Sequence, residues 1–169
     1  KSWLPRLQGA DPEISTMLKQ WDGRMRRDQP QPLIATLWMK DTVEHLLQKP
    51  LGTSFYDWWI WNDQAAQRLL ADDRECAPIT CDLLLRRSLD ETLAELKIKL
   101  GGDPKAWKWG DVHRFHFRHP VFRYIPVLSD WLDPNLATDG DAFTLNRGVP
   151  STAPGSIQLP DVHGPGMRF

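Results

Sequence analysis

The first helical pattern in the chain begins at Asp11-Pro12, where a residue able to cap a helix precedes a proline at the first helical position. The apolar residues behind this start recur at positions i, i+3, i+4 and i+7, as in an amphipathic helix. They are Ile14, Met17, Leu18 and Trp21. The pattern stops at Asp22-Gly23, so these signals predict a helix with one buried face.

A second helical pattern follows a basic and polar connection at residues 24–31. We expect its helix to end near Lys49-Pro50, because the residue before a proline avoids the helical region. Its apolar residues again lie mostly three and four positions apart. They are Leu33, Ile34, Leu37, Trp38, Val43, Leu46 and Leu47.

An aromatic cluster opens the third stretch, which reads FYDWWIWNDQAAQRLLAD from Phe55 onward. Its aromatic residues are too crowded to share one face of a helix, so part of the cluster must contact a second surface. These residues are Phe55, Trp58, Trp59 and Trp61. The chain holds nine tryptophans, which form large packed contacts or the walls of apolar pockets.

The fourth pattern predicts the longest helix of the chain. Thr80 is its candidate N-cap and Gly101-Gly102 its end. Asp103-Pro104 then repeats the earlier start signal and opens a short turn. The apolar stripe of this helix consists of Leu85, Leu89, Leu93, Leu96 and Leu100.

The character of the sequence changes after Pro120, where prolines, glycines and short apolar pieces replace helical spacing. Phe143–Asn146 alternates as a strand does, and residues 149–160 are rich in Ser, Pro and Gly, as loops are. We therefore expect a mainly α segment with a few β-strands, helical over 1–120 and loop-rich over 121–169. Because the last residues enter an apparent strand, we expect one partial domain, truncated at both ends.

Composition narrows the classes of partner. The 169 residues are enough for one domain, and a hydrophobic content of 41% is ordinary for a globular protein. With 21 basic and 22 acidic residues, the net charge is -1, so neither nucleic acid nor an anionic membrane is an expected partner. No apolar run approaches the roughly 18 to 20 residues of a membrane helix, and residues 1–10 lack the apolar centre of a signal peptide. We expect a soluble chain.

Two cysteines, Cys76 and Cys81, lie five positions apart on either side of Pro78. A disulfide is feasible if the chain turns there, and it would indicate an oxidising compartment. Two unpaired thiols are the alternative. A metal site made from these two residues alone is not expected, since zinc requires four ligands at recognisable spacings.

Three histidines, His113, His116 and His119, recur at every third position. On a strand, His116 would point away from the other two, and on a helix the three directions drift apart. Neither geometry brings them to one ion, so we expect no metal. Local hydrogen bonds and a turn at His119-Pro120 are the better interpretation.

Other polar groups also favour structural roles. Asp139-Gly140-Asp141 resembles the start of a calcium loop, but Pro150 stands where the loop requires glutamate, so a turn is expected. Ser156 lacks the surroundings of a nucleophile. Asp72-Asp73 is expected to be a solvated helix end.

Four stretches together resemble the later part of the β subunit in the penicillin amidase (penicillin acylase) family of N-terminal nucleophile hydrolases. Their order and spacing match that family over nearly the whole chain. They are LKQWDGRMRRDQPQPLI at Leu18–Ile34, WKWGDVHRFHFRHP at Trp107–Pro120, GDAFTLNRG at Gly140–Gly148 and VHGPGMRF at Val162–Phe169.

The resemblance implies an enzyme that hydrolyses a linear amide, such as the side chain of a β-lactam antibiotic or an N-acyl homoserine lactone, the latter a quorum-quenching activity. In this family an N-terminal serine is the nucleophile and its own α-amino group is the base. The chain begins at Lys1, and Ser2 in KSWLP does not resemble the family's processing site. No catalytic residue is therefore expected in this segment, which alone should be inactive.

The resemblance also implies the complete enzyme's fold, an α+β sandwich of two sheets flanked by helices. The expected partners are the remaining α and β portions of the same acylase and a small acyl-amide substrate. No cofactor is expected; calcium would belong to the complete enzyme, with ligands outside this segment. A periplasmic or secreted location follows from the family, and it favours pairing of Cys76 with Cys81.

Four residues are candidates for the substrate pocket: Trp107, Trp109, His113 and His119. Their main expected role is to hold the helical layer against the sheet, and one of them could reach the pocket wall. The alternative from another class is a non-catalytic, Trp-rich helical interaction module that presents Trp58–Trp61 to a partner. A metalloprotein that uses the three histidines is a weaker alternative.

Overall fold

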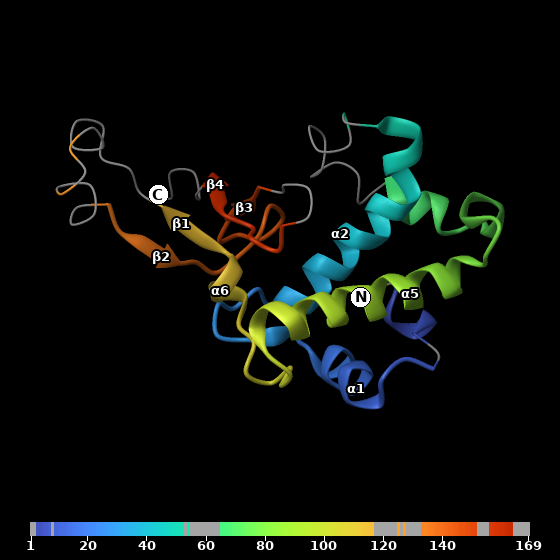
Figure 1. Ribbon diagram of the computed structural model, residues 1–169, viewed down its shortest axis with the longest axis horizontal. Coiled ribbons are helices and arrows are strands. Elements are labelled where there is room, and N and C mark those ends of the chain that lie inside the picture. The colour runs from blue at the N-terminus through green and yellow to red at the C-terminus, as the bar shows by residue number, and fades with distance from the viewer. Residues whose placement is uncertain are drawn as a thin grey trace. The chain divides into compact units, whose positions relative to one another are not determined.

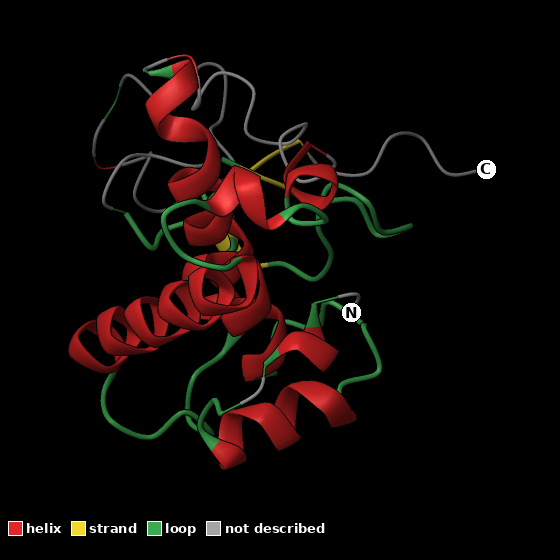
Figure 2. Cartoon of the chain, turned by 90° about the vertical axis from the view of Figure 1, so that its right-hand side faces the viewer, coloured by secondary structure: helices red, strands yellow, loops and turns green. Residues whose placement is uncertain are grey.

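A computed structural model describes residues 3–7, 9–52, 54, 65–116, 125, 127, 133–151 and 156–163. Within them the chain is mainly α with a few short strands, as the sequence predicts (Figures 1 and 2). It divides into two compact units, residues 1–24 with 30–107 and residues 25–29 with 108–169. The boundary expected near residue 120 lies outside the described residues. No helix among them is both long and apolar enough to cross a membrane.

The first unit opens with a short 3-10 helix, η1 (Leu4–Arg6), and the helix α1 (Pro12–Gln20). The Asp11 carboxylate accepts hydrogen bonds from the backbone N–H groups of Glu13 and Ile14, at 2.9 and 3.4 Å. The cap predicted from the sequence is therefore confirmed. Ile14 and Leu18 are buried on the inner face of α1.

Helix α2 spans Pro30–Leu51 and buries the apolar face that its spacing predicts. It ends at Leu51, one residue after Pro50, so the predicted end near Lys49-Pro50 is confirmed to within one residue. Gly52 follows with φ of +58°, a left-handed conformation that glycine adopts easily at helix ends.

Helix α5 spans Cys81–Leu100, after the 3-10 helix η2 (Asp73–Cys76). The Thr80 hydroxyl accepts from the Leu83 N–H at 3.3 Å, and Gly101 follows the helix with φ of +98°, so both predicted ends are confirmed. With 20 residues against 22 in α2, α5 is not the longest helix, contrary to the prediction. Four of its five stripe leucines are buried; Leu100 is half-buried.

Helices α2 and α5 cross and form the core of the first unit (Figure 1). The Trp38 indole N–H donates to the Leu85 carbonyl at 2.8 Å, and the Thr92 hydroxyl donates to the Asp41 carboxylate at 2.5 Å. Buried apolar side chains dominate the interface, so these two polar bonds set how the helices align.

The second unit contains the one-turn helix α6 (Trp109–Val112) and a small mixed sheet in the order β2-β1-β4-β3. Strand β1 pairs antiparallel with β2 and parallel with β4, while β3 pairs antiparallel with β4. The strands are β1 (Arg114–His116), β2 (Asn135–Ala137), β3 (Val149–Pro150) and β4 (Asp161–His163).

The strand predicted at Phe143–Asn146 is wrong, because this stretch is a turn. The Asp141 carboxylate accepts from the Phe143 N–H at 2.8 Å, and the Thr144 hydroxyl accepts from the Asp141 N–H at 2.9 Å. Side chains thus satisfy the backbone that a strand would have paired. The loop predicted from residue 149 begins two residues later, after β3.

Candidate functional site

Trp109 and His113 form the most enclosed polar cluster among the predicted site residues. They lie four positions apart at the start and end of α6, so their rings meet, stacked at 4.5 Å with an interplanar angle of 20°. Both side chains are fully buried. The Trp109 indole N–H donates to the Gly140 carbonyl at 3.1 Å, which ties the cluster to the turn before the Phe143 loop.

The protonation state of His113 follows from its one hydrogen bond. Its Nδ1 lies 2.8 Å from the Leu159 carbonyl, which can only accept, so Nδ1 carries the proton and Nε2 keeps the lone pair. Burial lowers the pKa of His113 below 6.5, although the Leu159 carbonyl and the charges of Asp161 and Asp141 oppose that shift. The imidazole is therefore neutral at pH 7.

Gly148 allows two polar side chains to approach each other. A Cβ atom on Gly148 would stand 2.8 Å from His113 Nε2 and 2.9 Å from an Asp161 carboxylate oxygen. Both side chains are buried, and His113 Nε2 forms no hydrogen bond with a described residue. A buried polar atom left without a partner costs about 1–3 kcal/mol, so Nε2 is an unusual feature of this cluster.

The other two predicted site residues are not part of this cluster in the structure. Trp107 is buried in the first unit, where its indole N–H donates to the Gly101 carbonyl at 2.9 Å and closes the end of α5. His119 lies outside the described residues. Whether any of the four lines a substrate pocket stays a prediction.

Sequence reasoning missed Gly148, Leu159 and Asp161. Gly148 closes one of the four stretches that carried the family resemblance, and Asp161 directly precedes another. Their positions beside these stretches are the signal that could have found them. Leu159 contacts His113 through its backbone carbonyl, which every residue type has, so the sequence does not reveal this contact.

Cys76 and Cys81 are joined in a disulfide, with their Cα atoms 5.2 Å apart. The alternative of two unpaired thiols is therefore wrong. The Asp73 carboxylate accepts from the Cys81 N–H at 2.8 Å, and Asp72 caps η2, so this acidic pair serves as helix ends. The bridge joins η2 to the first turn of α5.

The three histidines that recur at every third position differ in their surroundings. His113 is buried and His116 is exposed, while His119 lies outside the described residues. In the part of the chain that the structure describes, no three His, Cys, Asp or Glu side chains lie together as a metal site would require.

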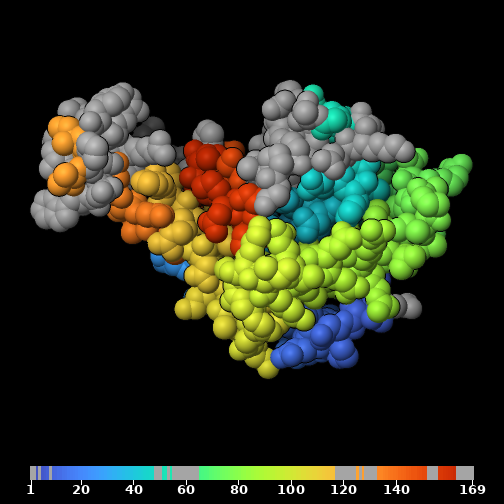
Figure 3. Space-filling model, in the orientation of Figure 1, coloured from blue at the N-terminus to red at the C-terminus, as the bar shows by residue number. Residues whose placement is uncertain are grey.

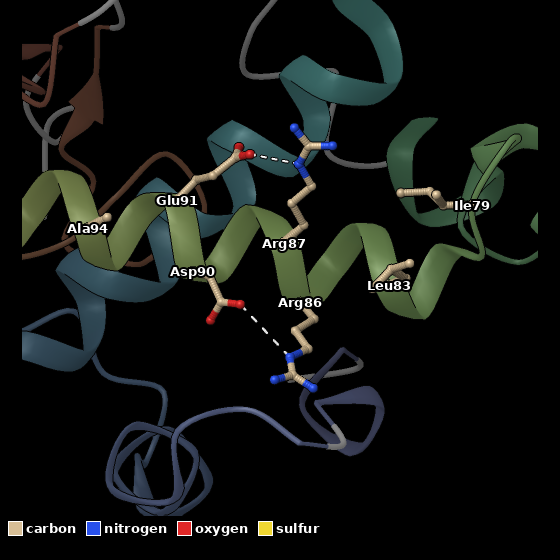
Figure 4. Close-up of a pocket in the computed structure, with 7 residues that line it drawn as sticks. All are labelled: Ile79, Leu83, Arg86, Arg87, Asp90, Glu91 and Ala94. Atoms are coloured by element: carbon tan, nitrogen blue, oxygen red, sulfur yellow. Dashed lines mark hydrogen bonds and ion pairs between the residues drawn. The ribbon is translucent and has the colours of Figure 1, made fainter.

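An open groove of about 450 Å³ runs along the outer face of α5, which lies at the surface in Figure 3. Figure 4 shows the ion pairs Arg86–Asp90, at 3.9 Å, and Arg87–Glu91, at 2.8 Å, on opposite sides of the helix. Ile79, Leu83 and Ala94 supply the apolar floor. The lining has no hydroxyl, thiol or imidazole, so it offers no nucleophile.

A second, polar pocket of about 280 Å³ lies between α2 and α5, lined by Asp41, Glu44, His45, Glu91 and Glu95. Burial raises the pKa of Asp41. For Glu91, burial opposes ionisation, but hydrogen bonds from Arg87 and His45 outweigh it and lower the pKa. The Lys40 Nζ lies 3.4 Å from a carboxylate oxygen of Glu44, and the Lys99 Nζ lies 2.6 Å from a carboxylate oxygen of Glu95. The pocket is thus a network of ion pairs.

Comparison with known proteins gives one family. The model of the penicillin amidase family matches residues 1–169. An acyl-homoserine lactone acylase, QuiP, from Pseudomonas fluorescens (strain Pf0-1) is 26% identical over 153 residues, which cover 81% of this chain and 18% of that protein. The penicillin acylase 2 proenzyme from Pseudomonas sp. (strain SE83) is 28% identical over 169 residues, which cover 88% of this chain and 20% of that protein. The chain spans about one fifth of the length of these curated relatives.

Proposed function

Because the chain belongs to the penicillin amidase family, we propose that it is a segment of an acylase whose N-terminal serine nucleophile lies outside this chain. The match of the family model to all 169 residues carries the proposal. Both relatives are named as acylases, which supports an amide-hydrolysing parent enzyme.

The chemistry of the described residues supports a non-catalytic role for this segment. Amide hydrolysis requires a nucleophile, a base beside it and donors for the oxyanion. His113 is enclosed against Trp109 and contacts a carbonyl, while both cysteines are joined in the disulfide. Ser156 accepts a hydrogen bond from the Gln158 N–H and serves the loop. The segment alone is expected to be inactive.

The substrate proposed for the complete enzyme is a linear amide that joins an acyl group to an amine. One relative is named for acyl-homoserine lactones and the other for penicillin, so both classes are candidates. The partners of this segment are then the remaining α and β portions of the acylase. Its expected structural contribution is a packed pair of helices and part of a sheet.

A periplasmic or secreted location forms part of the proposal. Disulfides persist in oxidising compartments and are rare in the cytosol, and Cys76–Cys81 is such a bond. The alternative of a Trp-rich interaction module rests on Trp58–Trp61, which lie outside the described residues.

The test is expression of the complete reading frame that contains this chain, beside the 169-residue chain alone. The complete protein should release acid from a chromogenic phenylacetyl amide or from a long-chain acyl-homoserine lactone. An alanine in place of the serine that begins its mature chain should abolish that release. Hydrolysis by the 169-residue chain alone would contradict the proposal, as would full activity in the alanine variant.

A further inference from the structure

The turn at residues 141–146 presents two large apolar side chains to its surroundings. Phe143 is 59% exposed, and Leu145 is 97% exposed, the largest fraction among the large apolar side chains that the structure describes. Single exposed apolar side chains are common on protein surfaces, whereas grouped ones mark contacts with other molecules. Two of them in one turn therefore make this turn a candidate contact surface.

The polar side chains of the same turn bond to its own backbone. The Asp141 carboxylate accepts from the Phe143 N–H at 2.8 Å. The Thr144 hydroxyl accepts from the Asp141 N–H at 2.9 Å and donates to the Asn146 carbonyl at 3.0 Å. Because these polar groups are used within the turn, Phe143 and Leu145 supply its large exposed side chains.

The base of the turn is held in one conformation. Gly140 has φ of +94°, and a Cβ atom there would stand 1.6 Å from the Asn146 carbonyl oxygen, so only glycine fits. The Gly140 carbonyl accepts from the Trp109 indole N–H at 3.1 Å, and the Gly148 N–H donates to the Asp141 carbonyl at 3.0 Å. A turn that is ordered before it meets a partner loses little conformational entropy on binding.

We propose that Phe143 and Leu145 form a contact surface for an apolar region on another part of the same acylase polypeptide, outside this chain. This inference rests on the proposed function, because it requires the complete enzyme. The length of the relatives supports this occupant: the chain covers 18% of one acylase and 20% of the other, so most of a protein of that size lies outside it.

Burial of this surface is favourable because it removes apolar side chains from water. It also has a small polar cost. The Asp141 carboxylate and the Thr144 hydroxyl already have hydrogen-bond partners within the turn, so covering Phe143 and Leu145 leaves neither of these groups without a partner.

Labelling of the complete protein with hydroxyl radicals, measured by mass spectrometry, tests the proposal. The rate of labelling at a leucine or phenylalanine depends on how exposed its side chain is. Leu159, at 0% exposed, gives the lower reference, and the same protein unfolded in urea gives the upper one. In the native complete protein, we expect the labelling of Phe143 and Leu145 to fall close to the rate at Leu159. Labelling of Leu145 at the unfolded rate would overturn the proposal.

Dilution and added substrate distinguish the other occupants. Protection that is lost when dilution separates copies of the complete protein would assign the surface to a second copy. Protection that appears only with a bound acyl amide would assign it to the substrate. Either result would overturn the proposal.

Release of acid from the acyl amide is measured on the same preparation, so that the two proposals can fail separately. Protection of Leu145 without hydrolysis would contradict the acylase function and leave the contact in place. Hydrolysis with an exposed Leu145 would contradict the contact alone.

Leu145→Ser and Leu145→Met form a matched pair of variants of the complete protein. Serine removes the apolar side chain from the contact and should lower the thermal midpoint, whereas methionine keeps an apolar side chain of similar volume and should retain most of it. An unchanged midpoint in Leu145→Ser would overturn the proposal. If Leu145→Ser does not fold, the labelling of the unsubstituted protein still decides.

Discussion

Breaking the Cys76–Cys81 disulfide is expected to lower the free energy of unfolding by about 2 kcal/mol. The bridge closes a loop with a sequence separation of five. For a loop of about six residues, the chain-entropy relation gives a loss of about 7 cal/mol/K in the unfolded state, or about 2 kcal/mol at 25 °C. For a chain of this length, that corresponds to a decrease of about 4 to 8 °C in the thermal midpoint.

The assay is urea unfolding of the chain with and without reductant, beside a double variant, Cys76→Ala with Cys81→Ala. Both sulfurs are buried, so alkylation followed by mass spectrometry must confirm that the bond has opened. Reductant should shift the midpoint of the unsubstituted chain and leave the double variant unchanged. An unchanged midpoint in a fully alkylated chain would refute the entropic reasoning. Free thiols in the oxidised protein would refute the bond itself.

Three further predictions concern the free energy of unfolding, which urea unfolding measures. Trp109→Phe keeps the ring but leaves the buried Gly140 carbonyl without its donor, so we expect a loss of about 2 kcal/mol. Trp21→Phe, at a half-exposed site, should lose less, and equal losses would contradict this account. Thr80→Ala removes the α5 cap and should cost about 1 kcal/mol, whereas the exposed Thr16→Ala should cost clearly less; similar costs would argue against the cap. Because the pKa of His113 is lowered in the folded state, His113 binds a proton in the unfolded chain at a higher pH than in the folded chain. The contribution of neutral His113 to the free energy of unfolding is therefore complete above about pH 6.5 and is lost as the pH falls toward the pKa of the folded state. The loss is about 1.4 kcal/mol for each pH unit that separates the two pKa values. His113→Gln should flatten that slope between pH 7 and 5, and an unchanged slope would contradict the assignment.

Local signals were sufficient for the helices of the first unit. Asp11, Thr80 and Gly101 act on neighbouring backbone groups, so their roles can be read from adjacent residues. The end of α2 lies at Leu51, one residue after the predicted Lys49-Pro50, because the conformational preference of the residue before a proline is also a local signal.

The strands could not be predicted in the same way. The alternation at Phe143–Asn146 is a local pattern, and the Asp141 and Thr144 side chains turn that segment instead. Strand β2 is mostly exposed, so Asn135–Ala137 carries no apolar alternation to detect. Its pairing with β1 depends on residues far away in the sequence.

The residues of the candidate site also include some that are close together in the sequence and some that are far apart. Trp109 and His113 are four residues apart, and their spacing is enough to place them together. Gly148, Leu159 and Asp161 join them from more than thirty residues away, through chain folding alone. Residue type gave no reason to connect these distant positions before the fold was known.

Native mass spectrometry of the protein purified from its source would show whether this chain works as one part of an acylase. We predict a polypeptide that begins with serine and that either contains the segment described here or remains bound to it. A folded chain that is found alone at 19.5 kDa, and is inactive on acyl amides, would contradict that prediction.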